Sequence, residues 1–254
     1  MDFSGKIVLV TGAAGGLGKA IATAFLDAGA SVSVCDINKD RLAEVEKEFA
    51  GPFDGKFLAT VADITNETSV NDFFNKTIER FGRLDVLVNN AGVADKFDPV
   101  GDVERSLWDR VMAINLTAPF LFCKLAVNQF QKQEPAGGII VNIASVASLK
   151  CGIAGAAYTA SKHGLLGLTK NTAVMYGAKN IRCVAVMPGG MHTNIAEAMA
   201  TGINPEGWKV AEKQMTGVLN DVIDVAQTVL FYSSPHAKGA NGAVVPVDGG
   251  WLAL

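Results

Sequence analysis

Apolar residues in this chain gather in short continuous runs, and longer stretches with helical spacing separate these runs. Seven runs are rich in β-branched residues, and they cover residues 7–10, 31–35, 57–61, 86–88, 139–143, 184–187 and 243–247. Most of them are apolar throughout, a pattern typical of strands buried on both faces of a parallel sheet. Helical patterns fill the intervals, at residues 17–28, 41–49, 69–81, 105–132, 158–176 and 221–232.

Strands and helices therefore alternate along the whole chain. This order predicts the α/β fold class, as a single doubly wound Rossmann-type domain with a seven-stranded parallel sheet and helices on both faces. No linker and no shift in composition divides the 254 residues, so we expect one domain over residues 1–254.

One stretch, residues 189–217, fits neither pattern and contains several glycines and Pro205. A loop of this length in a compact domain is usually a lid or a binding loop, and the alternative is a helical excursion on the surface. The stretch follows the carboxyl end of a strand, where α/β folds bind their ligands. We therefore expect a substrate-binding lid at about residues 190–217.

Composition and charge exclude several classes of protein. Hydrophobic residues make up 49% of the chain and charged residues 19%, so a large core can form and wholesale disorder is excluded. The net charge is −3 with no basic patch, which argues against a nucleic-acid partner. No uninterrupted apolar run approaches the ~18 residues of a membrane span, and no secretory signal is visible at the N-terminus. We expect a cytoplasmic protein with no membrane partner.

The four cysteines give no sign of a metal or redox site. Cys35, Cys123, Cys151 and Cys183 lie in or beside apolar segments, and no C-x-x-C motif is present. We expect no metal site, and we interpret all four as reduced core residues.

A glycine-rich turn joins the first predicted strand to the first predicted helix. Gly12, Gly16 and Gly18 follow a T-G-x-x-x-G-x-G spacing. Glycine permits positive φ and has no Cβ, so a pyrophosphate can approach the backbone, and the helix N-terminus offers free N–H groups. A Walker A loop is excluded because Ala20 stands where Ser or Thr is required. Such a turn is weak evidence alone, but its place between strand and helix favours a dinucleotide site.

Asp36 ends the second predicted strand, about 20 residues after the turn. A carboxylate at this place accepts hydrogen bonds from the adenosine ribose and repels a 2′-phosphate. No Arg or Lys occupies positions 14 and 15 to pair with that phosphate. The pattern favours NAD(H) over NADP(H), and the alternative is that Asp36 is only a polar strand end.

Tyr158 and Lys162 are four residues apart, which places them on one face of a predicted helix. A Tyr–Lys pair of this kind also arises by chance as a surface pair. Ser145 changes that assessment, because it follows the strand at 139–143 and so reaches the carboxyl edge of the sheet. Together the three side chains suggest acid–base chemistry beside a bound nicotinamide.

These motifs resemble, in order and in spacing, those of the classical short-chain dehydrogenase/reductase family. The resemblance covers essentially the whole chain and rests on the glycine turn, Asp63, Asn89-Asn90-Ala91-Gly92, Asn115, Ser145, Tyr158, Lys162, Pro188-Gly189 and the ending Val247-Asp248-Gly249-Gly250-Trp251. It implies an NAD(H)-dependent oxidoreductase that interconverts a secondary alcohol and a ketone by hydride transfer. It also implies a homotetramer, and the apolar tail at 251–254 is consistent with burial against a neighbouring subunit.

The resemblance implies four catalytic residues. Tyr158 would be the general acid/base, and Lys162 with the oxidised nicotinamide would stabilise its phenolate. Lys162 would also bind the nicotinamide ribose. Ser145 would donate a hydrogen bond to the substrate oxygen. Asn115 would help to hold a water that links Lys162 to solvent.

The same resemblance assigns cofactor and substrate contacts. The expected cofactor-binding residues are Gly12, Gly16, Leu17, Gly18, Asp36, Ile37, Asp63, Ile64, Asn90, Ala91, Gly92, Tyr158, Lys162, Pro188, Gly189, Met191 and Thr193. The expected substrate contacts are Ala94, Ser145, Ala147, Gly155, Tyr158 and His192. No Arg or Lys other than Lys162 is expected near the chemistry, which disfavours a carboxylate or phosphate anchored close to the reacting carbonyl.

Two alternatives remain open. A 3-oxoacyl-thioester (acyl-carrier) reductase would favour NADPH and a basic docking surface, and both Asp36 and the net charge argue against it. A non-catalytic dinucleotide-binding regulator would be expected to lack Ser145, Tyr158 or Lys162, and all three are present. The substrate itself is left open among polyols, cyclic alcohols, steroids and short ketones.

Overall fold

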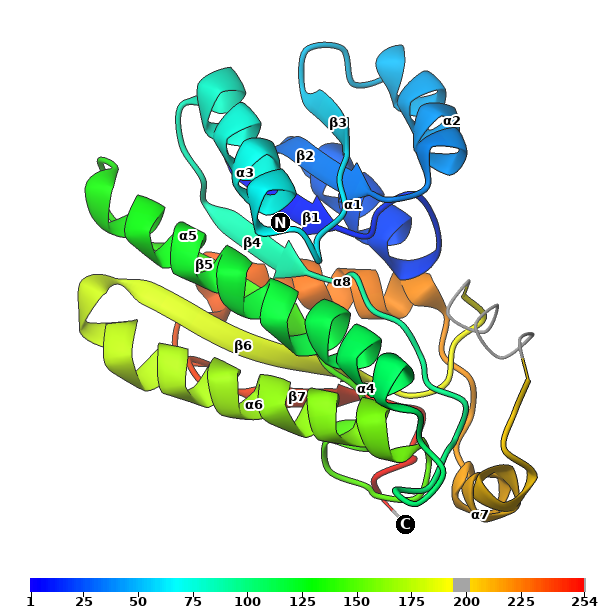
Figure 1. The fold of residues 1–254 in the computed structure, drawn as a ribbon. Coiled ribbons are helices and arrows are strands. Elements are labelled where there is room, and N and C mark those ends of the chain that lie inside the picture. The colour runs from blue at the N-terminus through cyan, green and yellow to red at the C-terminus, as the bar shows by residue number, and fades with distance from the viewer. Residues whose placement is uncertain (194–201, 254) are drawn as a thin grey trace.

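The computed structural model describes residues 1–193 and 202–253. Seven strands form one parallel sheet in the order β3-β2-β1-β4-β5-β6-β7 (Figure 1). The strands are β1 (Ile7–Thr11), β2 (Ser31–Asp36), β3 (Phe57–Val61), β4 (Val86–Asn89), β5 (Gly138–Ile143), β6 (Ile181–Pro188) and β7 (Val244–Val247). The strand order reverses between β1 and β4, which creates the crevice where sheets of this kind bind ligands.

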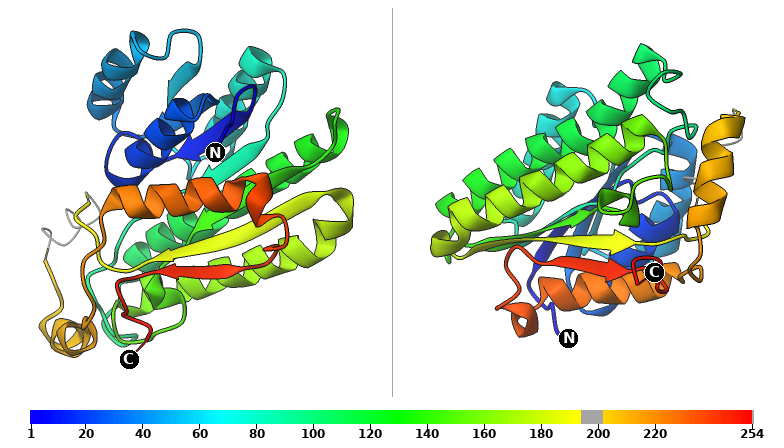
Figure 2. Two further views of the ribbon diagram at one scale, coloured as in Figure 1. Left: turned by 180° about the vertical axis from the view of Figure 1, so that it is seen from behind. Right: turned by 90° about the horizontal axis from the view of Figure 1, so that it is seen from below.

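Helices cover both faces of this sheet (Figure 2). One face carries α1 (Gly16–Asp27) and α8 (Val222–Ser233), with α2 (Lys39–Ala50) beside them. The other face carries α3 (Glu67–Phe81), α5 (Ala118–Lys132) and α6 (Ala156–Tyr176). The remaining helices are α4 (Arg105–Met112), α7 (Pro205–Gln214) and the short turns η1 (Ala113–Thr117), η2 (Val146–Ser148), η3 (Gly177–Lys179) and η5 (Pro235–Ala237). The doubly wound architecture predicted from the sequence is confirmed.

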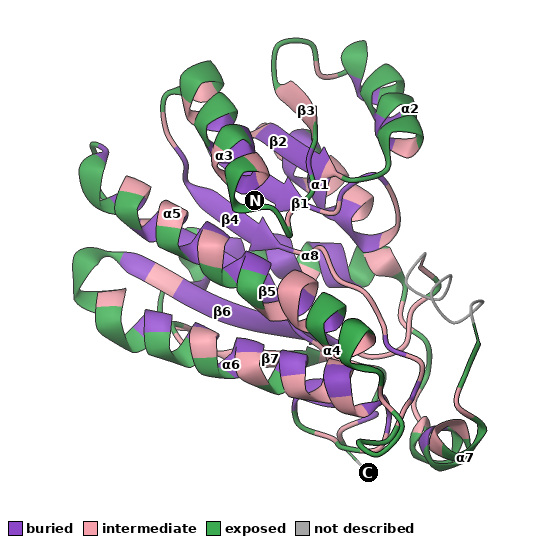
Figure 3. Ribbon diagram, in the orientation of Figure 1, coloured by how far each residue is buried: buried purple, intermediate pink, exposed green. Residues whose placement is uncertain are grey.

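A row of five valines runs across the middle of the sheet. Val34, Val10, Val88, Val141 and Val184 lie opposite one another on successive strands, and each is fully buried. They belong to the apolar cluster formed with α1 and α8. Side chains of the intervening residues face the other helix layer, so the central strands are buried on both sides (Figure 3). This double burial explains why the strand segments are continuous apolar runs.

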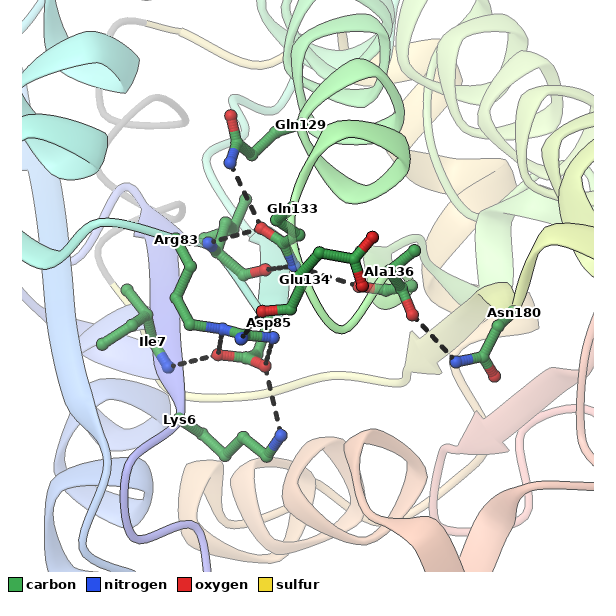
Figure 4. A network of polar contacts seen from close by, with 11 residues as sticks. Lys6, Ile7, Arg83, Asp85, Gln129, Gln133, Glu134, Ala136 and Asn180 are labelled. Carbon is green, nitrogen blue, oxygen red and sulfur yellow. Dashed lines mark hydrogen bonds and ion pairs between the residues drawn. The ribbon is translucent and has the colours of Figure 1, made fainter.

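A polar cluster holds the amino ends of β1 and β4 together (Figure 4). Asp85, just before β4, accepts hydrogen bonds from the backbone N–H of Ile7 at 3.0 Å and from Arg83 Nε at 3.1 Å and Nη2 at 2.9 Å. Lys6 Nζ lies 3.2 Å from the same carboxylate. Both carboxylate oxygens are thus satisfied by cations and a backbone N–H, which favours its burial.

The stretch at 189–217 contains a helix, as in the alternative that the sequence analysis left open beside a lid. Helix α7 begins at Pro205, and the Asn204 side chain caps its N-terminus by accepting from the N–H groups of Glu206 and Gly207. Proline at the first turn and Asn at the cap are typical helix starts. Residues 194–201, within the predicted lid, lie outside the described residues.

One sequence prediction about buried residues needs correction, and burial of the C-terminal tail against a neighbouring subunit stays a prediction. Cys35, Cys123 and Cys183 are buried, but Cys151 is exposed because it lies in the turn after η2 and not in the core. Trp251 is buried within its own chain, against a cluster that includes Val146. It therefore needs no neighbouring subunit for burial, and Leu254 lies outside the described residues.

The continuous helix over 105–132 is, within the described residues, the one helix long and apolar enough to cross a membrane by length and composition alone. In the fold Phe122, Ala126 and Phe130 of this helix pack on the sheet. A core helix that covers one face of a sheet can have the same length and composition, so these two properties alone are weak evidence for a membrane span.

Candidate active site

A cavity of about 1060 Å³ follows the carboxyl ends of the strands, from the glycine turn after β1 to helix α7. Every residue predicted to bind the cofactor lines this cavity. Among the predicted substrate contacts, the cavity wall includes Ala94, Ser145, Ala147, Tyr158 and His192. The fold therefore brings segments from both halves of the sequence to one edge of the sheet.

The glycine turn is shaped by its contacts with the segment after β4. Gly12 has a φ of 67°, and a Cβ there would lie 2.7 Å from Ala91 Cα. A Cβ on Gly18 would meet the Asn90 side-chain nitrogen at 2.5 Å. Asn90 Nδ2 donates to the carbonyls of Thr11 and Gly12, each at 2.9 Å. The amide of Asn90 thus holds the turn in place, and glycine is required where the two segments approach each other.

The turn fits a dinucleotide phosphate. Gly15 precedes α1 and offers no side-chain cap, so the first N–H groups of the helix have no side-chain partner from the cap position. Such N–H groups and the positive end of the helix dipole favour an anion. A Cβ on Gly16 would lie 3.3 Å from the Cβ of Thr193, so the turn lies close to the segment after β6 at this position. A bound pyrophosphate would therefore lie between the turn and the segment after β6.

Asp36 is oriented by two backbone groups at the end of β2. Its Oδ2 accepts from the N–H of Ala14 at 3.0 Å, and its Oδ1 accepts from the N–H of Asn38 at 2.9 Å. The carboxylate consequently faces the cavity beside the glycine turn, as a ribose acceptor requires. Arg41 also lines the cavity beside Asp36. The sequence argument considered only positions 14 and 15 and did not predict this cation.

Ser145 is fixed by the short turn η2 that follows β5. Its Oγ accepts a hydrogen bond from the N–H of Ala147 at 3.1 Å, while Ser148 Oγ accepts from the N–H of Ser145 at 3.3 Å. These reciprocal bonds form a capping box and orient the Ser145 side chain. Ser145 and Tyr158 line the same cavity, and a side-chain interaction with Ser145 lowers the pKa of Tyr158.

Tyr158 and Lys162 lie on the same face of α6. The Lys162 ammonium is 5.6 Å from the centre of the Tyr158 ring and donates to the carbonyl of Ile143 at 2.9 Å. Lys162 is 3% exposed, and burial lowers its pKa to about 8. Burial also raises the pKa of Tyr158 to about 12, which the interaction with Ser145 opposes and the charge of Asp95 reinforces. The phenol is therefore protonated and the amine mostly cationic at neutral pH.

Asn115 lies behind the cavity wall, in the π-helical turn between α4 and α5. It is fully buried; its Oδ1 accepts from the N–H of Val93 and its Nδ2 donates to the carbonyl of Val93, each at 2.9 Å. Nδ2 also reaches Ser161 Oγ at 3.2 Å. A Cβ on Gly92 would lie 3.4 Å from Asn115 Oδ1 and 3.6 Å from Lys162 Nζ. The π turn thus brings Asn115 close to Lys162.

Known proteins are similar to this chain in sequence and in fold. A family model described as "Enoyl-(Acyl carrier protein) reductase" matches residues 12–252. The "Short chain dehydrogenase/reductase dpchG" of Colletotrichum higginsianum is 49% identical over 257 residues, which cover 99% of this chain and 95% of that protein. The chain belongs to the short-chain dehydrogenase/reductase family. It is therefore an enzyme of an oxidoreductase family, as the resemblance implied.

Two further proteins are similar to this chain over nearly their whole length. The "3beta-hydroxysteroid dehydrogenase 2" of Eggerthella lenta is 35% identical over 98% of this chain and 96% of that protein. The crystal structure of levodione reductase superposes with a TM-score of 0.89 at 34% identity, and covers 99% of both chains. Family membership implies a nicotinamide dinucleotide as cofactor.

Several lining residues of this short-chain dehydrogenase/reductase were not predicted. The cavity wall also includes Lys96, Phe97, Leu107, Arg110, Leu219 and Trp251, together with Trp208 and Met215 from the predicted lid. Lys96 and Arg110 add two cations to the cavity wall, and the expectation that no Arg or Lys other than Lys162 lies near the reacting carbonyl stays a prediction. No motif marks these positions, and only the packing of α4, α7 and the C-terminal turn against the sheet edge brings them together.

Gly155, a predicted substrate contact, does not line the main cavity. It lines a separate hollow of about 530 Å³ at the N-terminus of α6, together with Cys151. A Cβ on Gly155 would lie 2.5 Å from Asp95 Oδ2 and 2.7 Å from the nitrogen of Asp98. Gly155 therefore faces another backbone segment, and its predicted contact with substrate has no support from the lining of the main cavity.

Proposed function

We propose that the protein is an NAD(H)-dependent oxidoreductase that interconverts a secondary alcohol and a ketone by hydride transfer, with Tyr158 as the general acid/base. One observation carries this proposal: Ser145, Tyr158 and Lys162 share one wall of the cavity that begins at the glycine turn. A bound nicotinamide would supply the hydride donor or acceptor. The residues of this chain supply binding, orientation and proton transfer.

The proton chemistry follows from the site. In ketone reduction the Tyr158 phenol donates its proton to the carbonyl oxygen, and Ser145 donates a hydrogen bond to the same oxygen as negative charge develops there. The raised pKa of Tyr158 keeps it in the protonated form that this direction needs. In alcohol oxidation the phenolate is the base, and the positive charge of Lys162 favours its formation.

The preference for NAD(H) is supported by Asp36, whose carboxylate is held toward the ribose side of the cavity. Arg41, also on that side, is the residue through which a 2′-phosphate could be tolerated. We expect NADH to bind more tightly than NADPH, and Asp36→Ala to narrow the difference. Fluorescence titration of both nucleotides measures this. Tighter binding of NADPH by the wild type would contradict the assignment.

Turnover tests the reaction itself. The names of the relatives suggest probes, so the panel contains a 3-hydroxysteroid with its ketone, levodione, and simple cyclic and acyclic ketones, each followed at the nicotinamide absorbance. We expect Tyr158→Phe to lower kcat about 10³-fold on any active substrate, because proton transfer is lost while the ring remains. A variant that keeps more than a few per cent of wild-type turnover would overturn the role of Tyr158.

The second candidate is a 3-oxoacyl-thioester (acyl-carrier) reductase. The description of the matching family model, which names an acyl-carrier protein reductase, is the observation that favours it. A 3-oxoacyl thioester added to the same panel decides between the two. A non-catalytic dinucleotide-binding regulator predicts nucleotide binding with no turnover on any substrate.

We also propose a cytoplasmic homotetramer, with domain 1–254 as the subunit. Exposed apolar side chains on α5 and α6 support association: Phe120 is 47% exposed, Val174 82% and Met175 64%. Light scattering measures the mass in solution, and a monomer would contradict the tetramer. Cell fractionation tests the location.

A further inference from the structure

Asp95 is a buried carboxylate that the catalytic assignment does not use. It lies in the loop between β4 and α4 and is 3% exposed. Its Oδ1 accepts from the N–H groups of Phe97 at 3.1 Å and Gly155 at 2.9 Å, and its Oδ2 accepts from the N–H of Tyr158 at 2.9 Å. Three backbone donors therefore converge on one side chain, and one of them belongs to the proposed acid/base residue.

Asp95 takes the place of the helix cap that α6 lacks. The cap position is Gly155, which has no side chain to accept from the free N–H groups of the first turn. Asp95, 60 residues before Gly155, accepts from the N–H of Gly155 and from that of Tyr158 in the first turn. A side chain on Gly155 would collide with it, since a Cβ would lie 2.5 Å from Asp95 Oδ2. An anion at this place also interacts favourably with the helix dipole.

The same carboxylate sets the shape of its own loop. Phe97 has a φ of 64°, a conformation that a large side chain rarely adopts, and its N–H is held by Asp95 Oδ1. In this conformation the Phe97 ring packs edge-on against Trp208 of α7, with ring centres 5.1 Å apart. The neighbouring carbonyl of Lys96 accepts from the N–H of Asn204 at 2.8 Å. Asp95 thus joins the wall formed by α7 to the turn that carries Tyr158.

The charge of Asp95 is not neutralised by a neighbouring cation. Within the described residues it forms no ion pair with Lys or Arg. Its negative charge raises the pKa of Tyr158, an effect second to burial in the same direction. The other titratable or charged groups along this part of the cavity are all bases, namely Lys96, Arg110, Lys162 and His192. Asp95 is therefore the carboxylate in the described part of this wall that contacts Tyr158, through the backbone N–H of that residue.

We propose that Asp95 is a positioning residue, which fixes the first turn of α6 and with it Tyr158 against the loop that contacts α7. This inference rests on the proposed function, because it assigns Asp95 a role in the proton transfer by Tyr158. Its physical basis is that proton transfer requires the phenol to be held at hydrogen-bond distance from the reacting oxygen.

The first experiment compares Asp95→Asn with the wild-type protein. The amide keeps the size of the side chain but turns an NH₂ group toward at least one backbone N–H donor. We expect kcat to fall about tenfold or more, while the Kd for NADH, measured by fluorescence titration, stays within about twofold. The glycine turn and Asp36 lie outside the Asp95 contacts, so cofactor binding is not expected to change.

The pH profile separates positioning from stability. Removal of the Asp95 charge is expected to move the midpoint of the alcohol-oxidation rate to lower pH, because a negative charge disfavours the phenolate. Gly155→Ala keeps the charge but displaces the carboxylate, so it should lower kcat with a smaller shift of the midpoint. Gly167→Ala is the matched control on the same helix, since a Cβ there meets no atom within 4 Å. We expect that control to leave both quantities unchanged.

Two results would overturn the proposal. One is an Asp95→Asn variant with the kcat and pH midpoint of the wild type. The other is a parallel loss of kcat, NADH affinity and thermal stability, which is the signature of a merely structural cap. If Asp95→Asn does not fold, Gly155→Ala decides by the same criteria. A Tyr158→Phe variant that keeps more than a few per cent of wild-type turnover would refute the proposed function and not the role of Asp95. In that case hydrogen exchange over residues 155–158, compared between the wild type and Asp95→Asn, still shows whether Asp95 holds this turn.

Discussion

Buried charges are paired with opposite charges at the amino end of the sheet and are held by backbone groups at its carboxyl end. At the amino end Asp85 contacts two cations, Lys6 and Arg83, together with a backbone N–H (Figure 4). At the carboxyl end Lys162 is buried with a backbone carbonyl as its hydrogen-bond acceptor, and Asp95 with backbone N–H groups. Within the described residues neither of these two forms an ion pair.

We infer from this difference that the charges at the amino end support the stability of the fold, whereas those at the carboxyl end support acid–base chemistry. A buried charge that is fully paired supports the fold, and removing one partner leaves the other uncompensated. Lys162 is buried without a counter-charge, and this burial lowers its pKa to about 8. Shifted proton affinities are what acid–base chemistry requires, and they cost stability. The comparison predicts that neutralising substitutions at the two ends have opposite effects.

Lys162→Met is expected to have the largest effect. Turnover should fall about 10²- to 10³-fold, because the cation that favours the phenolate is removed. The free energy of unfolding at pH 7 should nevertheless rise by about 1–2 kcal/mol, since a buried cation is replaced by an apolar chain of similar length. Steady-state kinetics and denaturant unfolding measure the two changes.

The pH dependence of that stability difference provides a control. The pKa of Lys162 is about 8 in the folded protein against an ordinary 10.5. Between these values the unfolded chain binds the additional proton, so wild-type stability rises with pH relative to the variant. The advantage of Lys162→Met should be complete below about pH 8 and vanish toward pH 10.5. A variant less stable than the wild type at pH 7 would contradict the comparison.

Asp85→Asn should show the opposite pattern, with an effect of intermediate size. The amide cannot accept through both of its terminal atoms, and the charge of the partly buried Arg83 loses its counter-ion. We expect a loss of about 2–3 kcal/mol in the free energy of unfolding, with kcat within about twofold of the wild type. Calorimetry and kinetics on one preparation check both. A tenfold lower kcat would show that the two ends are not separable.

Lys6→Met should have the smallest effect. Its side chain is 50% exposed, so its ion pair with Asp85 is screened by water and salt. We expect a change of less than about 1 kcal/mol, which decreases further at high salt. A loss as large as that of Asp85→Asn would mean that Lys6, and not Arg83, provides the main compensation at this end.

Much of the fold and of the central chemistry could be predicted from local patterns. The valine runs predicted strands buried on both faces, and the glycine turn, Asp36, Ser145, Tyr158 and Lys162 all reach one cavity. The sequence patterns missed contacts made between distant segments. Asp95 lies 60 residues before Gly155, and no local spacing relates the two. Gly155 was therefore interpreted as a substrate contact, whereas the structure shows that it makes room for Asp95.

The amino-acid sequence by itself determined the order of strands and helices, the parallel sheet and the residues that meet at its carboxyl edge. These follow from short-range periodicity, backbone conformation and the fixed handedness of the crossovers. Only the tertiary structure decided which charges are paired, how far Tyr158 and Lys162 are buried, and which further side chains line the cavity. Burial and pairing depend on the packing of segments that are remote along the chain, and proton affinities depend on burial and pairing.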